Sequence, residues 1–251
     1  MKSSIRFPAV LIATLFSWSA VNVYGEDVRR DEKALNVLQS MSAYTEKLDQ
    51  LVITSTSFSD ARLPAGLMVS NASEIKLTVD RPGSMHISVF DGLETKEIYF
   101  HEGNLTVFSS ENKFYGQTKI PDKIEAAAEY VLEELELEAP LMDLIYRDIA
   151  TQLMNSDDEI VYLTNKSRID GVDCHHIAIR GPEIDLQLWI TENDQPVPRR
   201  IMITSKWEGG TPRFVANMRW DSSPTINQDI FRFTAPEGST DIGFAKDTQQ
   251  P

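Results

Sequence analysis

The chain has 251 residues, a formal net charge of −14 and a single cysteine. One cysteine excludes a disulfide within the chain, so stability must come from an apolar core, which a chain of this length can build. The excess of acidic residues argues against a nucleic-acid partner and against unassisted binding to an anionic membrane surface, because both depend on Lys and Arg meeting phosphates.

Residues 1–25 have the layout of a secretory signal peptide. Lys2 and Arg6 precede an uncharged, largely apolar stretch at 7–23, and Val23 and Gly25 suit the pockets of a signal peptidase. This stretch is shorter than the about 20 apolar residues that a membrane span needs. We expect cleavage after Gly25, which removes two cations and no acid and takes the charge from −14 to −16. Residues 26–251 are then predicted to form a single exported, soluble domain.

Three segments show the periodicity of an amphipathic helix. The first covers residues 31–48, the second follows Pro121, and the third begins at Pro140. Proline suits the first turn of a helix, because its missing N–H would have no partner there. We therefore predict an N-terminal helix and a helical pair inserted at about residues 121–155.

Most of the remaining chain alternates apolar and polar residues, which is typical of strands buried on one face. Short turn signals with Gly, Pro, Asn or Asp separate these runs, and such spacing favours hairpins and an antiparallel sheet. We predict about ten or eleven strands. The clearest runs are 67–79, 85–89, 98–100, 105–107, 161–163, 177–179, 184–190, 201–207 and 214–220.

A sheet of this size is expected to curl, because the twist between neighbouring strands accumulates. Its apolar inner face must then close as a barrel or be covered, and the three helices can cover it. The sequence predicts an α+β fold, a curved antiparallel sheet forming an incomplete barrel, covered by the N-terminal helix and the inserted helical pair. The space between sheet and helices is a natural place for an apolar ligand.

The most conspicuous reactive residues are consecutive: Cys174, His175 and His176. In a strand, Cys174 and His176 share one face and His175 takes the other. Two soft ligands can begin a metal site, but tetrahedral zinc needs three or four, and His86 and His101 lie in other strands. A half-buried strand with hydrogen-bonded histidines is the simpler interpretation, and a nucleophilic Cys–His pair would need a base from elsewhere. The sequence carries no hydrolase, nucleotide-loop or metalloprotease motif, so we expect no enzyme, no cofactor and no metal site.

Two further features have open interpretations. Arg199 and Arg200 are predicted to lie at a solvated strand edge, with contact to a headgroup or a carboxylate as the alternative. By alternation, Trp189 points away from the apolar face.

The second half of the chain carries recognisable motifs. They are GVDCHHI at 171–177, LQLWI at 186–190, PVPRRI at 196–201 and FRFTAPEG at 231–238, with Ile242 after the last. Together with APLMDL at 139–144, they resemble a family of bacterial predicted periplasmic proteins of unassigned function, grouped with the LolA/LolB-like lipoprotein-carrier fold. The resemblance covers about residues 31–245. It implies an incomplete antiparallel barrel capped by helices in a Gram-negative periplasm, and it assigns no role to an individual residue.

These observations favour a periplasmic, non-enzymatic carrier or binding protein for a lipid, an acylated molecule or another hydrophobic ligand held between sheet and helices. The alternative is an envelope interaction or sensor domain that binds a partner polypeptide with the same half-barrel. A co-purifying lipid would favour the first hypothesis, and a stable protein partner the second. The residues expected to line the ligand site are apolar members of the predicted strands: Ile87, Val89, Ile98, Phe100, Leu186, Leu188, Ile190, Ile201, Ile203, Phe214, Met218 and Trp220.

Overall fold

The computed structural model describes residues 29–135, 141–146, 151, 153–154, 158–206 and 210–244. The predicted signal peptide and the predicted helix start at Pro140 lie outside these residues. The helices are α1 (Glu32–Thr45) and α2 (Ile124–Glu133), with the short 3-10 helices η1 (Met142–Ile145) and η2 (Gln228–Phe231). The strands are β1 (Gln50–Arg62), β2 (Met68–Asp80), β3 (Ser84–Phe90), β4 (Thr95–His101), β5 (Asn104–Ser109), β6 (Phe114–Lys119), β7 (Glu159–Ile169), β8 (Val172–Arg180), β9 (Ile184–Thr191), β10 (Pro198–Ser205), β11 (Arg213–Asp221) and β12 (Thr240–Asp241).

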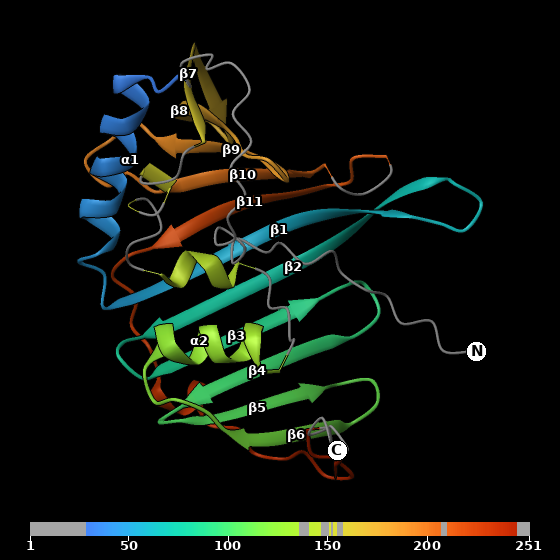
Figure 1. The fold of residues 1–251 in the computed structure, drawn as a ribbon. Helices are drawn as coiled ribbons and strands as arrows, with labels where there is room; N and C mark the ends of the chain where they lie inside the picture. The colour runs from blue at the N-terminus through green and yellow to red at the C-terminus, as the bar shows by residue number, and fades with distance from the viewer. Residues whose placement is uncertain are drawn as a thin grey trace, which may run out of the picture. The chain divides into compact units, whose positions relative to one another are not determined.

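All twelve strands belong to one hydrogen-bonded sheet, whose order is β12-β6-β5-β4-β3-β2-β1-β11-β10-β9-β8-β7 (Figure 1). The pairs from β2 to β6 and from β7 to β11 are antiparallel, and β12 runs parallel to β6. In the described part of the chain, β12 and β7 stand at opposite ends of this order, so the sheet is not closed. The predicted α+β class, with a large unclosed antiparallel sheet like an incomplete barrel, is confirmed.

Three strands, β1, β6 and β12, have no counterpart among the predicted runs. β1 buries Ser55, Ser57 and Ser59 at alternate positions, so burial alternates along it while hydropathy does not. β6 has Gly116 at its buried position, and β12 has two residues. The prediction of ten or eleven strands was therefore too low, because apolar alternation cannot reveal strands whose buried residues are small and polar.

The predicted helices are confirmed where the structure describes them. α1 and α2 lie in the first two predicted segments. The third segment contains η1 and, beyond it, helical backbone at Thr151, Leu153 and Met154. The rest of that predicted helix falls outside the described residues.

The chain divides into two compact units. Unit 1 comprises residues 1–48, 55–72 and 146–219, and unit 2 comprises residues 49–54, 73–145 and 220–251. Three of the five divisions fall within β1, within β2 and near the end of β11, and the other two lie between α1 and β1 and directly after η1. Each unit is thus held together by contacts between stretches far apart in the sequence. The single domain over residues 26–251 stays a prediction.

In unit 1, α1 packs against the sheet at β7. The helix buries Ala34, Leu38 and Met41 on its apolar side. Asp31 precedes the helix, and its carboxylate accepts the backbone N–H of Tyr162 in β7 at 2.8 Å. The residue that precedes α1 is therefore joined to a strand that follows it by more than a hundred residues.

In unit 2, α2 lies across β3 and β4 (Figure 1). Ile124, Ala127, Ala128 and Val131 are its buried apolar residues. The backbone N–H of Ile124 donates to the carbonyl of Pro82 at 3.0 Å, which anchors the start of α2 to the turn between β2 and β3.

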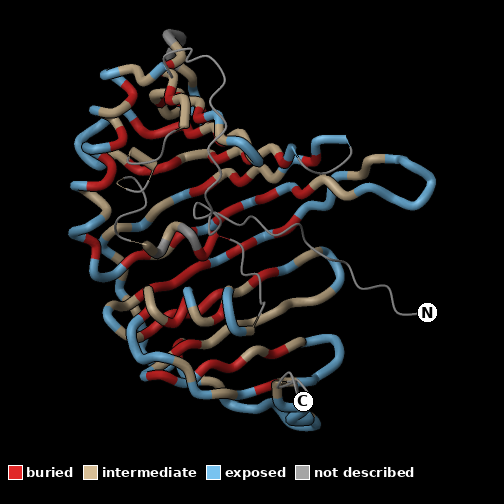
Figure 2. The backbone as a smooth tube through the Cα atoms, in the orientation of Figure 1, coloured by how far each residue is buried: buried red, intermediate tan, exposed pale blue. Residues whose placement is uncertain are grey.

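The C-terminal segment of unit 2 packs against aromatic residues of the sheet. The ring of Phe233 lies 5.0 Å from that of Tyr115, 5.4 Å from that of Tyr99 and 5.5 Å from that of Phe108. Strand register places Tyr99, Phe108 and Tyr115 on one face, whereas Phe100 and Ile87 belong to the other. Both faces of this part of the sheet are therefore packed, which explains the many buried residues on its strands (Figure 2).

Candidate functional site

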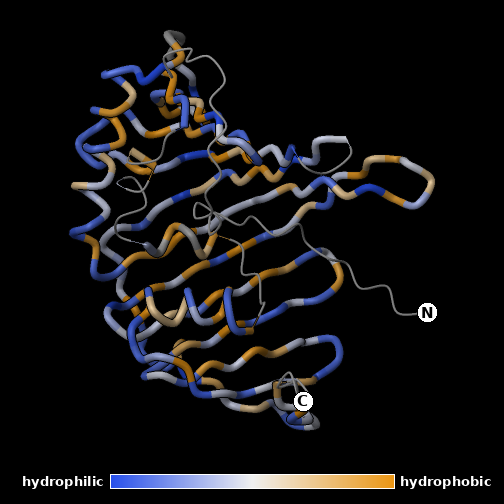
Figure 3. The backbone as a smooth tube through the Cα atoms, viewed as in Figure 1, coloured by the Kyte–Doolittle hydropathy of each residue, from blue (hydrophilic) through white to orange (hydrophobic). Residues whose placement is uncertain are grey.

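Seven of the predicted site residues share one face of β9, β10 and β11 in unit 1. Cross-strand register pairs Leu188 with Ile201, and Leu186 with Ile203. Ile203 pairs in turn with Phe214. Six of the seven are buried, and Phe214 is half-buried. The unit 1 apolar face is defined by Leu186, Leu188, Ile190, Ile201, Ile203, Phe214 and Met218, and the same alternation of apolar and polar residues is visible along the strands (Figure 3).

Four other predicted residues share a face in unit 2. Ile87 pairs with Ile98 across β3 and β4, and Phe100 pairs with Met85, two positions along. Val89 continues the same row. Ile87 and Phe100 are fully buried, and Ile98 is half-buried. These residues are the unit 2 apolar face.

The last predicted residue, Trp220, lies in β11 beyond the residues that register with β10. It is half-buried and belongs to unit 2. Sequence alternation therefore identified which residues share a face within each unit. Their role in binding a ligand stays a prediction.

A polar pair, which the sequence analysis missed, adjoins the unit 1 apolar face. The hydroxyl of Tyr162 lies 2.9 Å from Nδ1 of His175. Register pairs Tyr162 with Ile177, and His175 with Ile190, so both side chains belong to the apolar side of the sheet. The ammonium of Lys33, from α1, lies 4.0 Å from the centre of the Tyr162 ring. One sequence signal could have revealed this pair: His175 is a polar residue at a position where the strand alternation expects an apolar one.

The opposite face of unit 1 carries Cys174 and His176, as strand alternation predicted. The His176 ring stacks on Trp189 with centroids 4.1 Å apart and an interplanar angle of 19°, and its Nε2 lies 2.9 Å from Oε1 of Gln187. Trp189 thus points away from the apolar face, as predicted. Burial raises the pKa of the Cys174 thiol and lowers the pKa of His176, so both are uncharged at neutral pH. In the part of the chain that the structure describes, no three His, Cys, Asp or Glu side chains gather to hold a metal ion.

The two arginines do not lie at a solvated strand edge, so that prediction was wrong. β10 is an interior strand between β9 and β11. Arg199 is 14% exposed, and its Nη1 donates to the carbonyl of Met218 at 2.9 Å. Nε of Arg200 donates to Oδ1 of Asn217 at 2.5 Å. A register irregularity between Pro198 and Arg200 makes Arg199 the extra residue of a bulge, which strand alternation cannot foresee.

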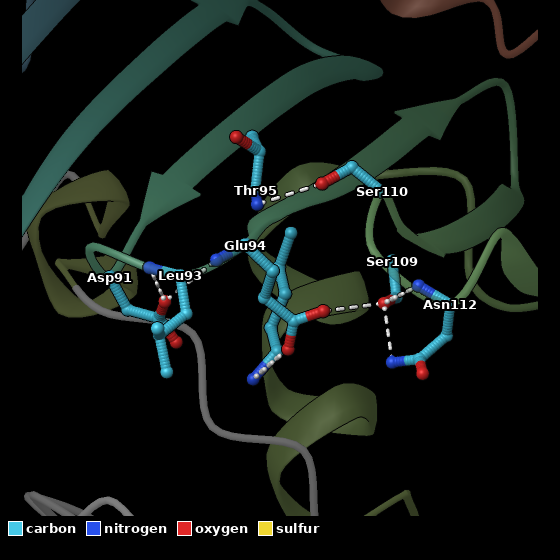
Figure 4. Close-up of polar contacts among 8 residues, drawn as sticks. Asp91, Leu93, Glu94, Thr95, Ser109, Ser110 and Asn112 are labelled. Atoms are coloured by element: carbon cyan, nitrogen blue, oxygen red, sulfur yellow. Dashed lines mark hydrogen bonds and ion pairs between the residues drawn. The ribbon is translucent and has the colours of Figure 1, made fainter.

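In unit 2, the turn between β3 and β4 exposes the side chain of Leu93 to solvent. Oδ1 of Asp91 accepts the backbone N–H groups of Leu93 and Glu94 at 3.0 Å each (Figure 4). Desolvation raises the pKa of Asp91, but these backbone bonds outweigh it and hold the pKa below its usual value. Glu94 also accepts a bond from Ser109 at 2.5 Å, and Ser109 in turn accepts one from Asn112. The result is a fixed turn on which Leu93 is 80% exposed.

The chain has similarity to one protein family and to several solved structures. The family model described as "Predicted periplasmic protein (DUF2092)" matches residues 34–245. The fold is similar to that of the lipoprotein LppX of Mycobacterium tuberculosis, with a TM-score of 0.48 and 10% identity over 78% of this chain and 99% of that chain. It is similar to LprF from Mycobacterium bovis, with a TM-score of 0.47 and 12% identity over 84% and 99% of the two chains.

A LolA superfamily protein from Nitrosomonas europaea is also similar, with a TM-score of 0.36 and 10% identity over 80% of this chain and 97% of that chain. Similarity at this level transfers neither a ligand nor a partner. No curated protein has a matching sequence. No helix among the described residues is long and apolar enough to cross a membrane.

Proposed function

Because this chain belongs to the DUF2092 family of periplasmic proteins, we propose that it is a non-enzymatic carrier or binding protein for a hydrophobic ligand. The observation that carries this proposal is the breadth of the apolar side of β7 to β11, which includes the unit 1 apolar face. The ligand class that fits is a molecule with an acyl chain or a similar apolar body.

The apolar side of β7 to β11, which includes the unit 1 apolar face, is wider than one helix. Neighbouring strands lie about 4.8 Å apart, so β7 to β11 span about 19 Å. A helix with its side chains is about 10 Å across. α1 is the one helix of unit 1 that the structure describes over its full length, and it is fastened at β7. Large apolar residues continue to β11, at Ile201, Ile203 and Phe214. This breadth supports an apolar ligand lying beside α1, where it would take the place of the groups that now bury six of the seven residues of the unit 1 apolar face.

The chemistry of the face suits an amphipathic ligand. Transfer of each CH₂ group from water to an apolar surface contributes about 0.8 kcal/mol, so an acyl chain gains affinity without specific contacts. The hydroxyl of Tyr162 and the ring of His175 supply hydrogen-bonding groups at the same face. A polar head beside this pair, with its chain toward Leu188 and Ile201, is the arrangement that we propose.

The first test is mass spectrometry of an organic extract of the protein, purified from a periplasmic fraction without detergent. A stoichiometric lipid or other apolar molecule would support the proposal and identify the ligand class. A well-folded protein with an empty extract would contradict it. If a stoichiometric polypeptide partner accompanied the empty protein, the interaction-domain alternative would replace it.

A pair of variants tests the position of the site. Leu188→Gln places an amide on the unit 1 apolar face, whereas Met202→Gln makes a similar change on the opposite face, where Met202 packs against the cluster of Ile169, Cys174 and Trp189. We expect Leu188→Gln to lose most of the bound ligand and Met202→Gln to retain it, with circular dichroism confirming that both fold. Equal ligand content in the two folded variants would place the site elsewhere.

A further inference from the structure

The tip of the β1–β2 hairpin in unit 1 is a cluster of exposed apolar residues. β1 ends at Arg62 and β2 begins at Met68, and every residue between them is exposed. Leu63 is 43% exposed and Leu67 is 61% exposed. The hairpin tip, residues 62–68, reaches past the neighbouring ends of β10 and β11 (Figure 1). Its leucines are therefore displayed on a projection, not on a flat surface.

The hairpin tip has a defined conformation. The backbone N–H of Gly66 donates to the carbonyl of Leu63 at 2.8 Å, and the N–H of Leu63 donates to the carbonyl of Leu67 at 2.9 Å. Pro64 occupies the second position of this turn, where its fixed φ suits a β-turn. Gly66 has a φ of +86°, in the left-handed region that glycine adopts without strain. Binding through the tip would therefore cost little conformational entropy.

The charge around the tip differs from that of the whole chain. The chain carries a net charge of −14, yet residues 61–73 contain one charged residue, Arg62, and no acid. The nearest acid before the tip, Asp60, is paired with Arg213 at 3.3 Å. The acidity that opposes membrane binding by the molecule as a whole is thus absent from this projection.

We propose that the hairpin tip docks the protein on a phospholipid bilayer. Leu63 and Leu67 enter the boundary between headgroups and acyl chains, and Arg62 stays at the level of the phosphates, as long basic side chains do at such interfaces. A convex, apolar projection fits a deformable lipid surface, whereas a protein partner would need a matching pocket. The proposal rests on the periplasmic location, between two membranes, and not on the bound ligand.

A site-specific fluorescent label tests the contact directly. Cys174 is the one natural cysteine and is fully buried, so a cysteine placed at an exposed position can be labelled selectively. Leu67→Cys and the control Leu93→Cys would each carry a polarity-sensitive thiol dye on the full exported protein. On addition of vesicles of phosphatidylethanolamine and phosphatidylglycerol, we expect a blue shift at position 67 and no shift at position 93. A silent label at position 67, or equal shifts at both positions, would overturn the proposal.

Charged variants test how much of the binding depends on the leucines. Leu63→Asp combined with Leu67→Asp is expected to lower the vesicle-bound fraction in flotation by about tenfold or more. The reason is that each substitution removes the favourable free energy of moving a leucine side chain from water into the bilayer. Leu93→Asp, which alters an even more exposed leucine, should leave flotation unchanged. Thermal unfolding confirms that each variant folds. Equal losses in both variants, or a wild-type protein that does not float with vesicles, would overturn the proposal. A wild-type protein that carried a ligand but ignored vesicles would overturn it and leave the proposed function standing.

Discussion

At the scale of single residues, burial decides the chemistry of the most conspicuous motif. Cys174 and His176 lie on the same face, where Cys174 is fully buried and His176 is half-buried against the ring of Trp189. The thiol is kept protonated and the imidazole neutral, because the low-dielectric surroundings disfavour the charged form of each. The motif is therefore a packed part of the sheet in this structure.

The raised pKa of Cys174 has two measurable consequences. Since the thiolate is the reactive form, we expect native protein to react with a thiol reagent about tenfold more slowly for each unit by which the pKa is raised, and slower still because the thiol is enclosed. Denatured protein should react at the ordinary rate. Rapid labelling of the native protein at pH 7 would contradict the burial of this side chain.

The raised pKa of Cys174 also makes the stability of the folded protein depend on pH in the alkaline range. A folded-state pKa above the unfolded value favours the native state below the unfolded pKa, and this contribution is lost as pH rises through the folded pKa. Wild-type stability should therefore fall above about pH 8.5 more steeply than that of Cys174→Ala. Urea unfolding of the two proteins at a series of pH values measures the difference.

At the scale of elements, the short strand β12 pairs with β6 and so covers the edge that β6 would otherwise expose. The N–H groups of Thr240 and Ile242 donate to the carbonyls of Lys113 and Tyr115, at 2.9 and 2.8 Å. A side chain at Gly116 would meet the carbonyl oxygen of Gly243 at 2.9 Å. This glycine therefore permits the close approach of the two segments, which blunts an otherwise exposed sheet edge.

Replacing Gly116 by alanine should loosen this attachment. The added methyl group collides with backbone, which cannot move aside without breaking the β6–β12 hydrogen bonds. We expect faster hydrogen exchange in the peptide covering residues 239–244, with little change in β3 and β4. Lys119→Ala, at an exposed position of the same strand, is the control. Unchanged exchange in Gly116→Ala would show that the segment does not approach β6 so closely.

A second prediction at this scale concerns α1, whose amphipathic pattern is plain in the sequence. Leu38 is fully buried and the next residue, Gln39, is exposed. Leu38→Ala should lower the free energy of unfolding by about 2–5 kcal/mol, through lost apolar burial and the cavity that remains. Gln39→Ala should change it by about 0.5 kcal/mol or less. Urea unfolding measures both, and equal effects would mean that α1 does not pack through the face that its pattern indicates.

At the scale of the whole molecule, ligand and fold are expected to stabilise each other. A ligand that binds only the native state adds about 2.7 kcal/mol when its free concentration is a hundred times Kd. Protein stripped of bound apolar material should therefore melt at a lower temperature in calorimetry, and returning the extract should restore the melting temperature. If the melting temperature were identical before and after stripping, the bound material would not contribute to the stability of the fold.

The residues that share a face can be read from the alternation along each strand. Leu186, Leu188 and Ile190 fall on one side, and Cys174 and His176 on the other, because side-chain direction along a strand is a local property with a period of two. The helical period of α1 was equally readable, since it depends on spacing within one segment.

The order of the strands and the groups that cover each residue are visible only in the folded chain. It buried the serines of β1, placed Arg199 in a bulge of an interior strand, and laid β12 along β6. These outcomes depend on pairing between segments far apart in the chain, and hydropathy along one segment carries no information about its distant partners. The physical reason is that burial is a property of the surroundings, whereas the pattern within a strand belongs to the strand itself.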